Sequence, residues 1–142
     1  MTIDSIINGI VLDHIPAGKS MEIYKILNLS RLDCQVAIIK NAVSRKLGRK
    51  DIIKIDSILD VDLSVLGYIG PGITVNIVHD GRIAEKRSLS LPDEVRDVIR
   101  CKNPRCITSV EQELPQVFCL ADREHGVYRC KYCEAPAERE KY

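Results

Sequence analysis

The chain has 142 residues, and its 21 Lys and Arg residues nearly balance its 20 Asp and Glu residues, leaving a net charge of +1. Aromatic residues make up only 4% of the sequence, so we expect no basic field or base-stacking surface for nucleic acid. No apolar run approaches the length of a membrane span and no secretory signal is visible, so we expect a cytoplasmic protein without a membrane partner.

Hydrophobic periodicity predicts five strands and two helices in the first part of the chain. The strands are expected at residues 9–15, 35–44, 50–55, 74–78 and 82–88. The helices are expected at residues 21–28, after Ser20 as the N-cap, and at residues 61–69. Asp80 and Gly81 form a hairpin signal between the last two strands. This order of elements predicts an α+β fold with a ferredoxin-like split βαβ sheet.

The last third of the chain has a different character. Residues 89–100 carry mixed charges and are expected to form a helical or extended linker. The segment that follows is too small to bury an adequate core by itself. We therefore predict two domains, residues 1–92 and residues 93–142, of which the second is small, all-β and zinc-ribbon-like. The charged tail, residues 134–142, is expected to be poorly ordered.

Four of the six cysteines form two pairs in this second domain. Cys101 and Cys106 enclose a spacer of four residues, and Cys130 and Cys133 enclose a spacer of two. Two such pairs facing each other can place four thiolates in a tetrahedron, which suits a structural Zn²⁺ ion that performs no catalysis. A disulfide framework is an alternative that a reducing cytoplasm disfavours. A thioredoxin-like pair is another, but no βαβ pattern surrounds Cys130 and Cys133.

One predicted strand carries two lysines with the same orientation. Lys50 and Lys54 are four residues apart with Ile52 between them, so all three face one side of the sheet. Lys86 lies in the last strand. Such a face could hold a flat base on apolar groups and a polyphosphate on ammonium groups. A solvated polar face is the simpler interpretation of the pattern alone.

The sequence shows no catalytic constellation. It lacks a nucleophile elbow, a metalloprotease helix and a phosphate-binding glycine loop. His79 and His125 are expected at the surface. By spacing alone, Asp13 and His14 are a pair at the end of the first strand with no indicated function.

Four segments, in order, resemble the regulatory chain of aspartate carbamoyltransferase. The matching segments are residues 9–16 (G-I-V-L-D-H-I-P), residues 48–55 (G-R-K-D-I-I-K-I), the stretch from T-V-N at residues 74–76 through Lys86 to S-L-P at residues 90–92, and the cysteine pattern with its C-K-Y-C ending. The longer spacer of the first cysteine pair, unusual for a zinc ribbon, is the spacing of this family. Gly81 stands where the family pattern has an aromatic residue, and Arg105 where it has Asn.

The resemblance implies a non-catalytic subunit for allosteric regulation in pyrimidine biosynthesis. It implies that the first domain binds CTP or ATP, with UTP and Mg²⁺ as a further effector, and that the second holds one structural Zn²⁺ and docks on the catalytic chain. It also implies a regulatory-chain homodimer through the N-terminal domain, within an assembly of six catalytic and six regulatory chains.

The site residues implied by the resemblance fall into two groups. The zinc ligands are Cys101, Cys106, Cys130 and Cys133. Asp13 and His14 would contact ribose and phosphate, Lys54 and Lys86 the polar groups of the nucleotide, and Lys50 the triphosphate. The base and sugar would be lined by Ile3, Ile6, Val11, Ile52, Asn76, Val78 and Ile83.

Two other classes of protein compete with this interpretation. A zinc-ribbon nucleic-acid module would need a basic stripe with aromatic residues, which the composition does not favour. A thiol-based or small-molecule enzyme would need a reactive cysteine or a base outside the cysteine cluster, and none stands out in the sequence.

Overall fold

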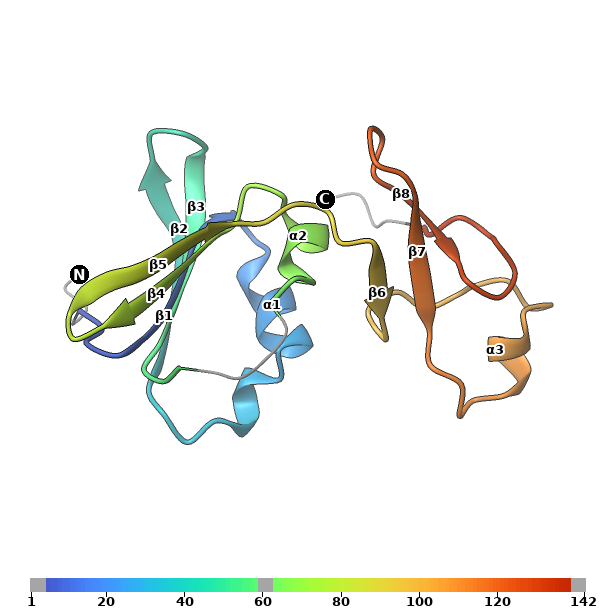
Figure 1. Ribbon diagram of the computed structural model, residues 1–142, viewed down its shortest axis with the longest axis horizontal. Coiled ribbons are helices and arrows are strands. Elements are labelled where there is room, and N and C mark those ends of the chain that lie inside the picture. Colours follow the sequence, from blue (N-terminus) through green and yellow to red (C-terminus); the bar gives the residue numbers. More distant parts are fainter. Residues whose placement is uncertain (1–4, 59–62, 139–142) are drawn as a thin grey trace. The chain divides into compact units, whose positions relative to one another are not determined.

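The computed structural model of the protein describes residues 5–58 and 63–138. The chain divides into two compact units, Met1–Ser90 and Leu91–Tyr142. The elements of the first unit are β1 (Gly9–Pro16), α1 (Ser20–Ile26), the 3-10 helix η1 (Leu29–Arg31), β2 (Val36–Ser44), β3 (Gly48–Ile55), α2 (Leu66–Ile69), β4 (Thr74–His79) and β5 (Arg82–Ser88) (Figure 1). Those of the second are β6 (Glu94–Arg96), α3 (Ile107–Val110), β7 (Val117–Asp122) and β8 (Val127–Cys130). Among the described residues, no helix is long and apolar enough to cross a membrane.

The N-terminal unit is built on a five-stranded sheet with the order β2-β3-β1-β4-β5. Every neighbouring pair of strands is antiparallel. The chain passes through α1 between β1 and β2, and through α2 between β3 and β4, which leaves β1 and β3 at the centre. This is the predicted ferredoxin-like split βαβ sheet, with β5 added at one edge.

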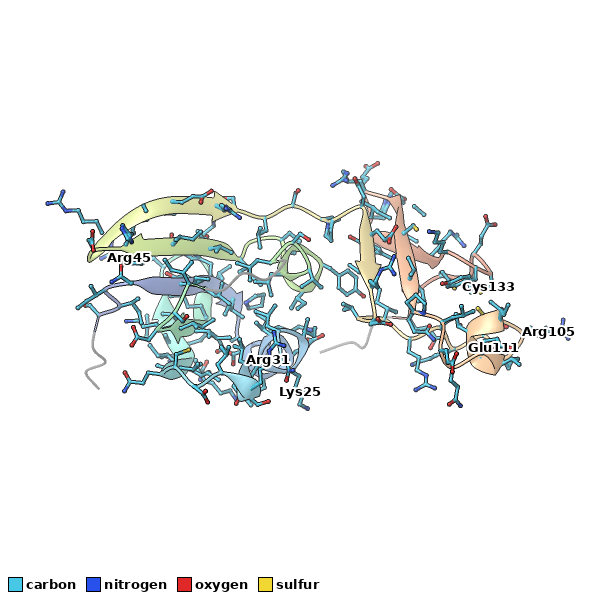
Figure 2. The ribbon with its side chains drawn as sticks, turned by 60° about the horizontal axis from the view of Figure 1, so that its bottom comes forward. Lys25, Arg31, Arg45, Arg105, Glu111 and Cys133 are labelled. Carbon is cyan, nitrogen blue, oxygen red and sulfur yellow. The ribbon has the colours of Figure 1, made fainter. Side chains whose placement is uncertain are left out.

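One face of this sheet forms the core together with the helices. Alternate residues of the central strands and the inner residues of α1 and α2 are almost fully buried: Ile10, Leu12, Ile53, Ile55, Val75, Ile23 and Leu66. Each such side chain contributes about 1.5–3 kcal/mol by leaving water. On the outer side of the helical layer, Lys25 and Arg31 are exposed (Figure 2). No helix of the described residues covers the opposite face of the sheet, which is called the open face below (Figure 1).

The second helix is shorter than predicted. Where the sequence predicts a helix over residues 61–69, α2 begins at Leu66. Just before it, the backbone N–H groups of Leu66 and Gly67 bond to the carbonyls of Leu63 and Ser64, at 3.1 and 3.0 Å. These bonds span three residues, so the chain turns tightly before it becomes α-helical. Residues 59–62, which include Asp60 and Asp62 as candidate N-cap residues of the predicted helix, lie outside the described residues.

Two β-bulges flank the middle of β3, one in each neighbouring strand. In β2, residues 40–41 oppose Asp51, and in β1, residues 13–14 oppose Ile52. A bulge removes a backbone N–H from the regular ladder of hydrogen bonds. Here carboxylates accept both displaced groups: Asn41 N donates to Asp51 at 2.9 Å, and His14 N donates to Asp13 at 2.6 Å.

The C-terminal unit contains a three-stranded antiparallel sheet with the order β6-β7-β8. Its small core includes Val95, Val117, Phe118 and Tyr128, each no more than 3% exposed. The prediction of a helical or extended linker over residues 89–100 is therefore only partly right. Residues 94–96 are a strand of this sheet, because Val95 pairs with Phe118 and is buried beside it.

The prediction that the tail is poorly ordered is wrong for residues 134–138. Cys130 N donates to Ala135 O at 2.9 Å, and Ala137 N donates to Tyr128 O at 2.8 Å. Pro136 forms a bridge with Arg129. These backbone bonds attach the segment to β8 although its composition is charged. Residues 139–142 lie outside the described residues.

Candidate metal centre and ligand-binding face

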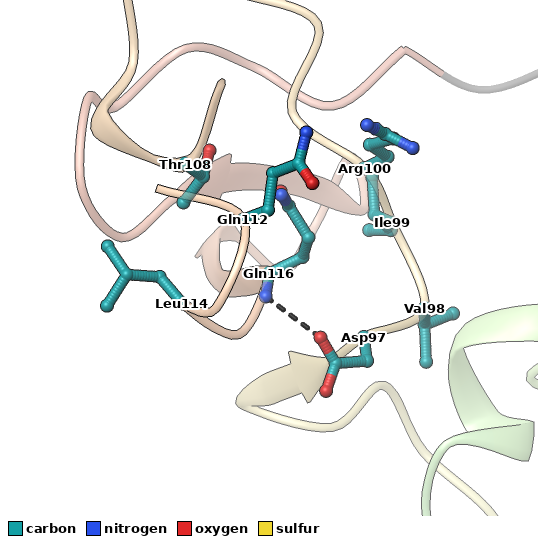
Figure 3. A pocket seen from close by; sticks show the side chains of 8 residues that line it. All are labelled: Asp97, Val98, Ile99, Arg100, Thr108, Gln112, Leu114 and Gln116. Atoms are coloured by element: carbon teal, nitrogen blue, oxygen red, sulfur yellow. Dashed lines mark hydrogen bonds between the residues drawn. The ribbon is translucent and has the colours of Figure 1, made fainter. Parts of the chain in front are cut away.

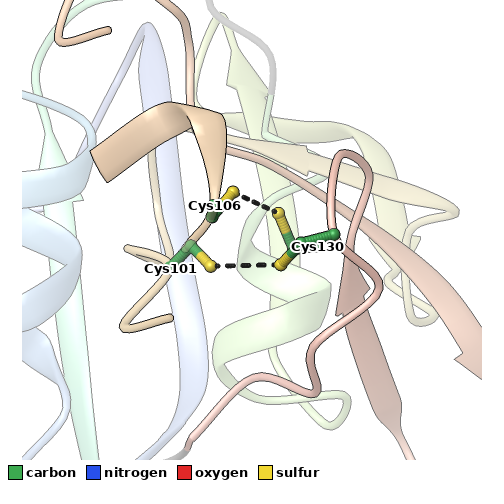
Figure 4. Close-up of side chains that lie close together, drawn as sticks. Cys101, Cys106 and Cys130 are labelled. Carbon is green, nitrogen blue, oxygen red and sulfur yellow. Dashed lines mark hydrogen bonds between the residues drawn. The ribbon is translucent and has the colours of Figure 1, made fainter. Parts of the chain in front are cut away.

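The four paired cysteines come together in the C-terminal unit. Their sulfur atoms all lie within 4.8 Å of one another. Sγ of Cys101 is 3.6 Å from Sγ of Cys133, and Sγ of Cys106 is 3.8 Å from Sγ of Cys130 (Figure 4). Four sulfurs at about 2.3 Å from a tetrahedral Zn²⁺ would be about 3.8 Å apart, so the cluster has the dimensions of a closed four-thiolate zinc site.

The two cysteine pairs are positioned by different secondary-structure elements. Cys106 directly precedes α3, and its backbone N–H donates to Asn103 O at 3.0 Å, which closes the turn of the first pair. Cys130 ends β8, and its carbonyl accepts the N–H of Glu134 at 2.9 Å, which folds the chain back at the second pair. All six cysteines of the chain are free thiols, so the structure offers no disulfide framework.

The cluster cannot easily carry four negative charges without a cation. Burial raises the pKa of the Cys101 thiol to about 12 and also raises that of Cys130. The backbone N–H of Ala135 holds the pKa of Cys133 down at about 7. A bound metal ion reverses this preference, because it ligates thiolates and displaces their protons. The donor set therefore fits a soft divalent cation.

On the open face of the N-terminal sheet, four of the predicted ligand residues form a single row. Val11 pairs with Lys54 on one side and with Asn76 on the other, and Asn76 pairs with Lys86. Neighbouring strands are about 4.8 Å apart, so the row spans roughly 14 Å between the two lysine backbones. Within the described residues, Asn76 Oδ1 is buried and has no hydrogen-bond partner. A ligand that donates a hydrogen bond at the centre of the row would satisfy this atom.

A second group lies at the bulge of β1. Nζ of Lys50 is 2.9 Å from Oδ1 of Asp13, and both side chains are mostly buried. Burial would raise the pKa of Asp13, but the hydrogen bonds from Lys50 and from the backbone of His14 hold it below its ordinary value. His14 has a φ of 57°, and its Nδ1 lies 3.1 Å from Thr74 Oγ1. This bulge thus gathers one carboxylate, one ammonium group and one imidazole.

The remaining residues predicted to bind the nucleotide differ in burial and in their position on the open face. Ile52 is half-buried in β3 on the same face as the two lysines that flank it, as the alternation predicts. At the other end of the face, Val78 pairs with Ile83, and the exposed fractions of the two side chains are 7% and 61%. Ile6 packs so closely on Gly9 that an added Cβ would collide with it. Ile3 lies outside the described residues.

Asp51 is a structural residue of this region that the sequence analysis did not single out. It is fully buried, and besides Asn41 N its carboxylate accepts the backbone N–H groups of Gly18 and Ser20 at 3.1 and 3.3 Å. It therefore ties the start of α1 and the bulge of β2 to β3. The sequence did hold a signal, because Asp51 has the same parity in its strand as the core residues Ile53 and Ile55.

The comparisons with known proteins cover both units. Residues 1–90 match the family described as "Aspartate carbamoyltransferase regulatory chain, allosteric domain", and residues 93–142 match "Aspartate carbamoyltransferase regulatory chain, metal binding domain". The chain belongs to the family of aspartate carbamoyltransferase regulatory chains. As a member of this family, it is a regulatory and not a catalytic subunit.

Similar aspartate carbamoyltransferase regulatory chains come from several bacteria. The protein of that name from Clostridium botulinum is 54% identical over 94% of this chain and 92% of its own length. The Clostridium acetobutylicum protein is 52% identical over the same shares. The Bifidobacterium longum protein is 43% identical over 97% of this chain and 99% of its own length. The resemblance seen in the sequence is thus confirmed over almost the whole chain.

Two departures of this regulatory chain from the family pattern have a structural setting. Asp80 and Gly81 have φ values of 51° and 77° and join the paired residues His79 and Arg82. This is a two-residue turn with positive φ at both positions, which favours Gly over an aromatic residue. Arg105 is exposed in the spacer of the first cysteine pair, and its side chain points away from the unit (Figure 2).

Proposed function

We propose that this regulatory chain binds nucleoside triphosphates on the open face of its N-terminal sheet and transmits their binding to the catalytic chains. The proposed effectors are CTP and ATP, with UTP and Mg²⁺ as a further effector. The observation that carries the proposal is the row of Lys54, Val11, Asn76 and Lys86, because it puts two cations around an apolar position and an unsatisfied amide oxygen.

Each part of the open face would make a different contact with the nucleotide. The lysines would bind phosphate oxygens by charge-assisted hydrogen bonds, which are stronger than neutral ones. Val11 and Ile52, with Ile3, Ile6, Val78 and Ile83, would line the base and the sugar. Asp13 and His14, at the bulge, would contact ribose and phosphate. Asn76 Oδ1 would accept a hydrogen bond from an exocyclic amino group or a hydroxyl.

We propose that the metal of the C-terminal unit is Zn²⁺, one ion per chain, bound by Cys101, Cys106, Cys130 and Cys133. The distances between their sulfurs and the closed set of four thiolates support this metal. Zinc binding of this kind contributes on the order of 10–16 kcal/mol to the folding of a small domain. Its role here would be structural.

The proposal assigns residues 1–92 to effector binding and to a regulatory-chain homodimer, and residues 93–142 to docking on the aspartate carbamoyltransferase catalytic chain. Six chains of each kind would assemble. Ile107 and Val110 of α3 support the docking role, since their exposed fractions of 51% and 74% leave an apolar surface that a partner could cover. A cytoplasmic location and a place in pyrimidine biosynthesis stay predictions.

The decisive experiment measures CTP and ATP binding by calorimetry on the wild-type chain and on Lys86→Ala. Loss of one charge-assisted contact to phosphate is worth about 1.5–3 kcal/mol, so the affinity should fall roughly ten- to a hundredfold. Lys25→Ala is the matched control, because Lys25 is exposed on α1, at the other face of the sheet. Equal losses in the two variants would mean general charge attraction and would refute the site.

Transmission is tested with the catalytic chain present. Its activity is assayed alone and together with this chain, each with and without CTP or ATP. The complex should respond to nucleotide, whereas this chain by itself should transfer no carbamoyl group. A complex that assembles and ignores every nucleotide would contradict the regulatory mechanism.

A further inference from the structure

The two cysteine pairs of the metal centre are supported in different ways. The second pair has the short spacer and receives N–H groups from its own turn: those of Tyr132 and Cys133 reach the Cys130 sulfur, and that of Ala135 reaches the Cys133 sulfur. The first pair has the longer spacer, and its own turn supplies one such N–H group, that of Asn103, to the Cys101 sulfur. A longer spacer gives the chain more freedom at its cysteines, so contacts from outside the turn can do more to fix them.

We infer that Thr108 and Gln116 are positioning residues that hold the first cysteine pair in its metal-binding geometry. Oγ1 of Thr108 donates to Sγ of Cys106 at 3.1 Å, and the two side chains are 5% and 1% exposed. Oε1 of Gln116 accepts the backbone N–H of Cys101 at 2.9 Å. Each cysteine of the first pair thus has its own partner outside the spacer. The inference rests on the proposed zinc site.

Gln116 can serve as an anchor because its own backbone is fixed. Its N–H donates to Oδ1 of Asp97 at 2.9 Å (Figure 3). Its carbonyl accepts the N–H of Asp97 at 2.7 Å. Asp97 directly follows β6, and Gln116 directly precedes β7. The amide side chain therefore attaches Cys101 to the end of the sheet.

Both positioning residues line one pocket of about 450 Å³. The pocket is lined by Asp97, Val98, Ile99, Arg100, Thr108, Gln112, Leu114 and Gln116 (Figure 3). Two of these lining residues are close to the first cysteine pair in the sequence, since Arg100 directly precedes Cys101 and Thr108 lies two residues after Cys106. The first pair is thus supported by side chains from outside its spacer, one at the edge of the sheet and one in α3.

The hydroxyl of Thr108 has a chemical as well as a geometric role. Four thiolates around one Zn²⁺ leave a net charge of −2 in a mostly buried site. A hydroxyl that donates to one sulfur lowers the electron density on it and stabilises its thiolate form. Partners of this kind typically contribute ten- to a hundredfold in metal affinity.

The test compares Thr108→Val with Thr108→Ser in the zinc-loaded full-length chain. Valine has nearly the shape of threonine without its hydroxyl, whereas serine keeps the hydroxyl. The rate of zinc release to a chromogenic chelator should rise roughly tenfold in Thr108→Val and stay near wild type in Thr108→Ser. In the Co²⁺-substituted chain, the sulfur-to-cobalt charge-transfer band should shift to longer wavelength in Thr108→Val alone.

A zinc-loaded Thr108→Val chain with the release rate and the cobalt spectrum of the wild type would overturn the role of Thr108. Ser109→Ala provides a further control, since the Ser109 hydroxyl donates to the carbonyl of Asn103 and not to a sulfur. Equal acceleration in Ser109→Ala would also overturn it. A wild-type chain that contains no zinc would instead refute the proposed metal.

Gln116 is tested against its neighbour in the pocket wall. Gln116→Ala should accelerate zinc release several-fold, because Cys101 loses its attachment to the sheet. Gln112→Ala is the matched control, since Gln112 lines the same pocket and is exposed. Equal rates in the two variants would overturn the role of Gln116.

Discussion

Among the described residues, the N-terminal unit buries twelve large apolar residues in one cluster between its sheet and its helices, whereas the C-terminal unit, outside its cysteines, buries five: Val95, Ile99, Val117, Phe118 and Tyr128. The C-terminal unit also contains the four clustered cysteines, three of which are buried. Because of this difference, we expect the two units to unfold in response to different changes. Loss of apolar volume should affect the first, and loss of metal the second.

Removing the metal should produce the largest difference between the units. In Cys130→Ser the cluster keeps three sulfurs, so the C-terminal unit should lose the proposed Zn²⁺ ion and unfold while the N-terminal unit stays folded. Metal analysis and limited proteolysis measure the two outcomes. Cys119→Ser is the control, because Cys119 lies outside the cluster. Retained zinc and an unchanged protease pattern in Cys130→Ser would refute the assignment.

A cavity in the apolar core should have the opposite effect. Leu12 is fully buried, so Leu12→Ala should destabilise the N-terminal unit by about 2–5 kcal/mol, as measured by urea unfolding. The zinc content should stay at the wild-type level. Val43→Ala is the control, because Val43 is 78% exposed and its loss should matter little. Loss of zinc from Leu12→Ala would show that the units do not fold separately.

Asp51 should make the N-terminal unit sensitive to acid. Burial would raise its pKa, but hydrogen bonds from Ser20, Asn41 and Gly18 lower it below 3.8. A carboxyl whose pKa is lower in the folded state contributes its full stability above the unfolded pKa of about 3.9 and loses it as the pH falls through the folded value. Unfolding should therefore become easier below about pH 4.

Asp51→Asn separates this effect from general acid denaturation. The variant should be less stable by about 1–3 kcal/mol at neutral pH, because the amide replaces a charged acceptor of three backbone N–H groups. The loss should shrink below pH 4, where the wild-type carboxyl also becomes neutral. A difference between the two proteins that stays constant down to pH 2 would contradict the lowered pKa.

The smallest effect on stability is expected at Lys50. Its ion pair with Asp13 is mostly buried, with side chains 17% and 23% exposed, so Lys50→Ala should cost about 1 kcal/mol, the upper end of the range for exposed pairs. Its effect on ligand binding should be larger and selective: affinity for CTP should fall more than affinity for CMP. Similar losses for the two nucleotides would show that Lys50 does not contact the terminal phosphates.

The sequence predicts most strands of the N-terminal sheet because their apolar residues alternate, whereas β5, which is exposed throughout, is predicted from the hairpin signal of Asp80 and Gly81. That alternation also predicts that Lys50, Ile52 and Lys54 share a face. It does not predict the bulges, because an inserted residue leaves no hydrophobic signal. The parity of Asp51 indicates that its side chain is buried, but the displaced N–H groups that Asp13 and Asp51 accept could not be foreseen.

In the C-terminal unit, the spacing of the cysteines predicts the metal ligands but not the residues that hold these ligands in place. Gln116 reaches Cys101 by a contact between residues fifteen positions apart, which no local pattern encodes. Thr108 lies only two residues after Cys106, but a single hydroxyl residue at that position gives no signal of its contact with the sulfur. The strand at residues 94–96 was missed for a similar reason, since three residues are too few to show alternation, and the pairing of Val95 with Phe118 decides their conformation. Short elements are set by what they pack against.

The two bulges beside β3 also bear on how the chain finds its fold. A slip of β3 by one residue would turn Lys50 and Lys54 into the core and expose Ile53 and Ile55. It would also leave the N–H of Asn41 without the Asp51 carboxylate that now accepts it. A misaligned hairpin would thus lose apolar burial and hydrogen bonds together, so it should reopen quickly. Refolding of the N-terminal unit should then proceed without long-lived misregistered intermediates.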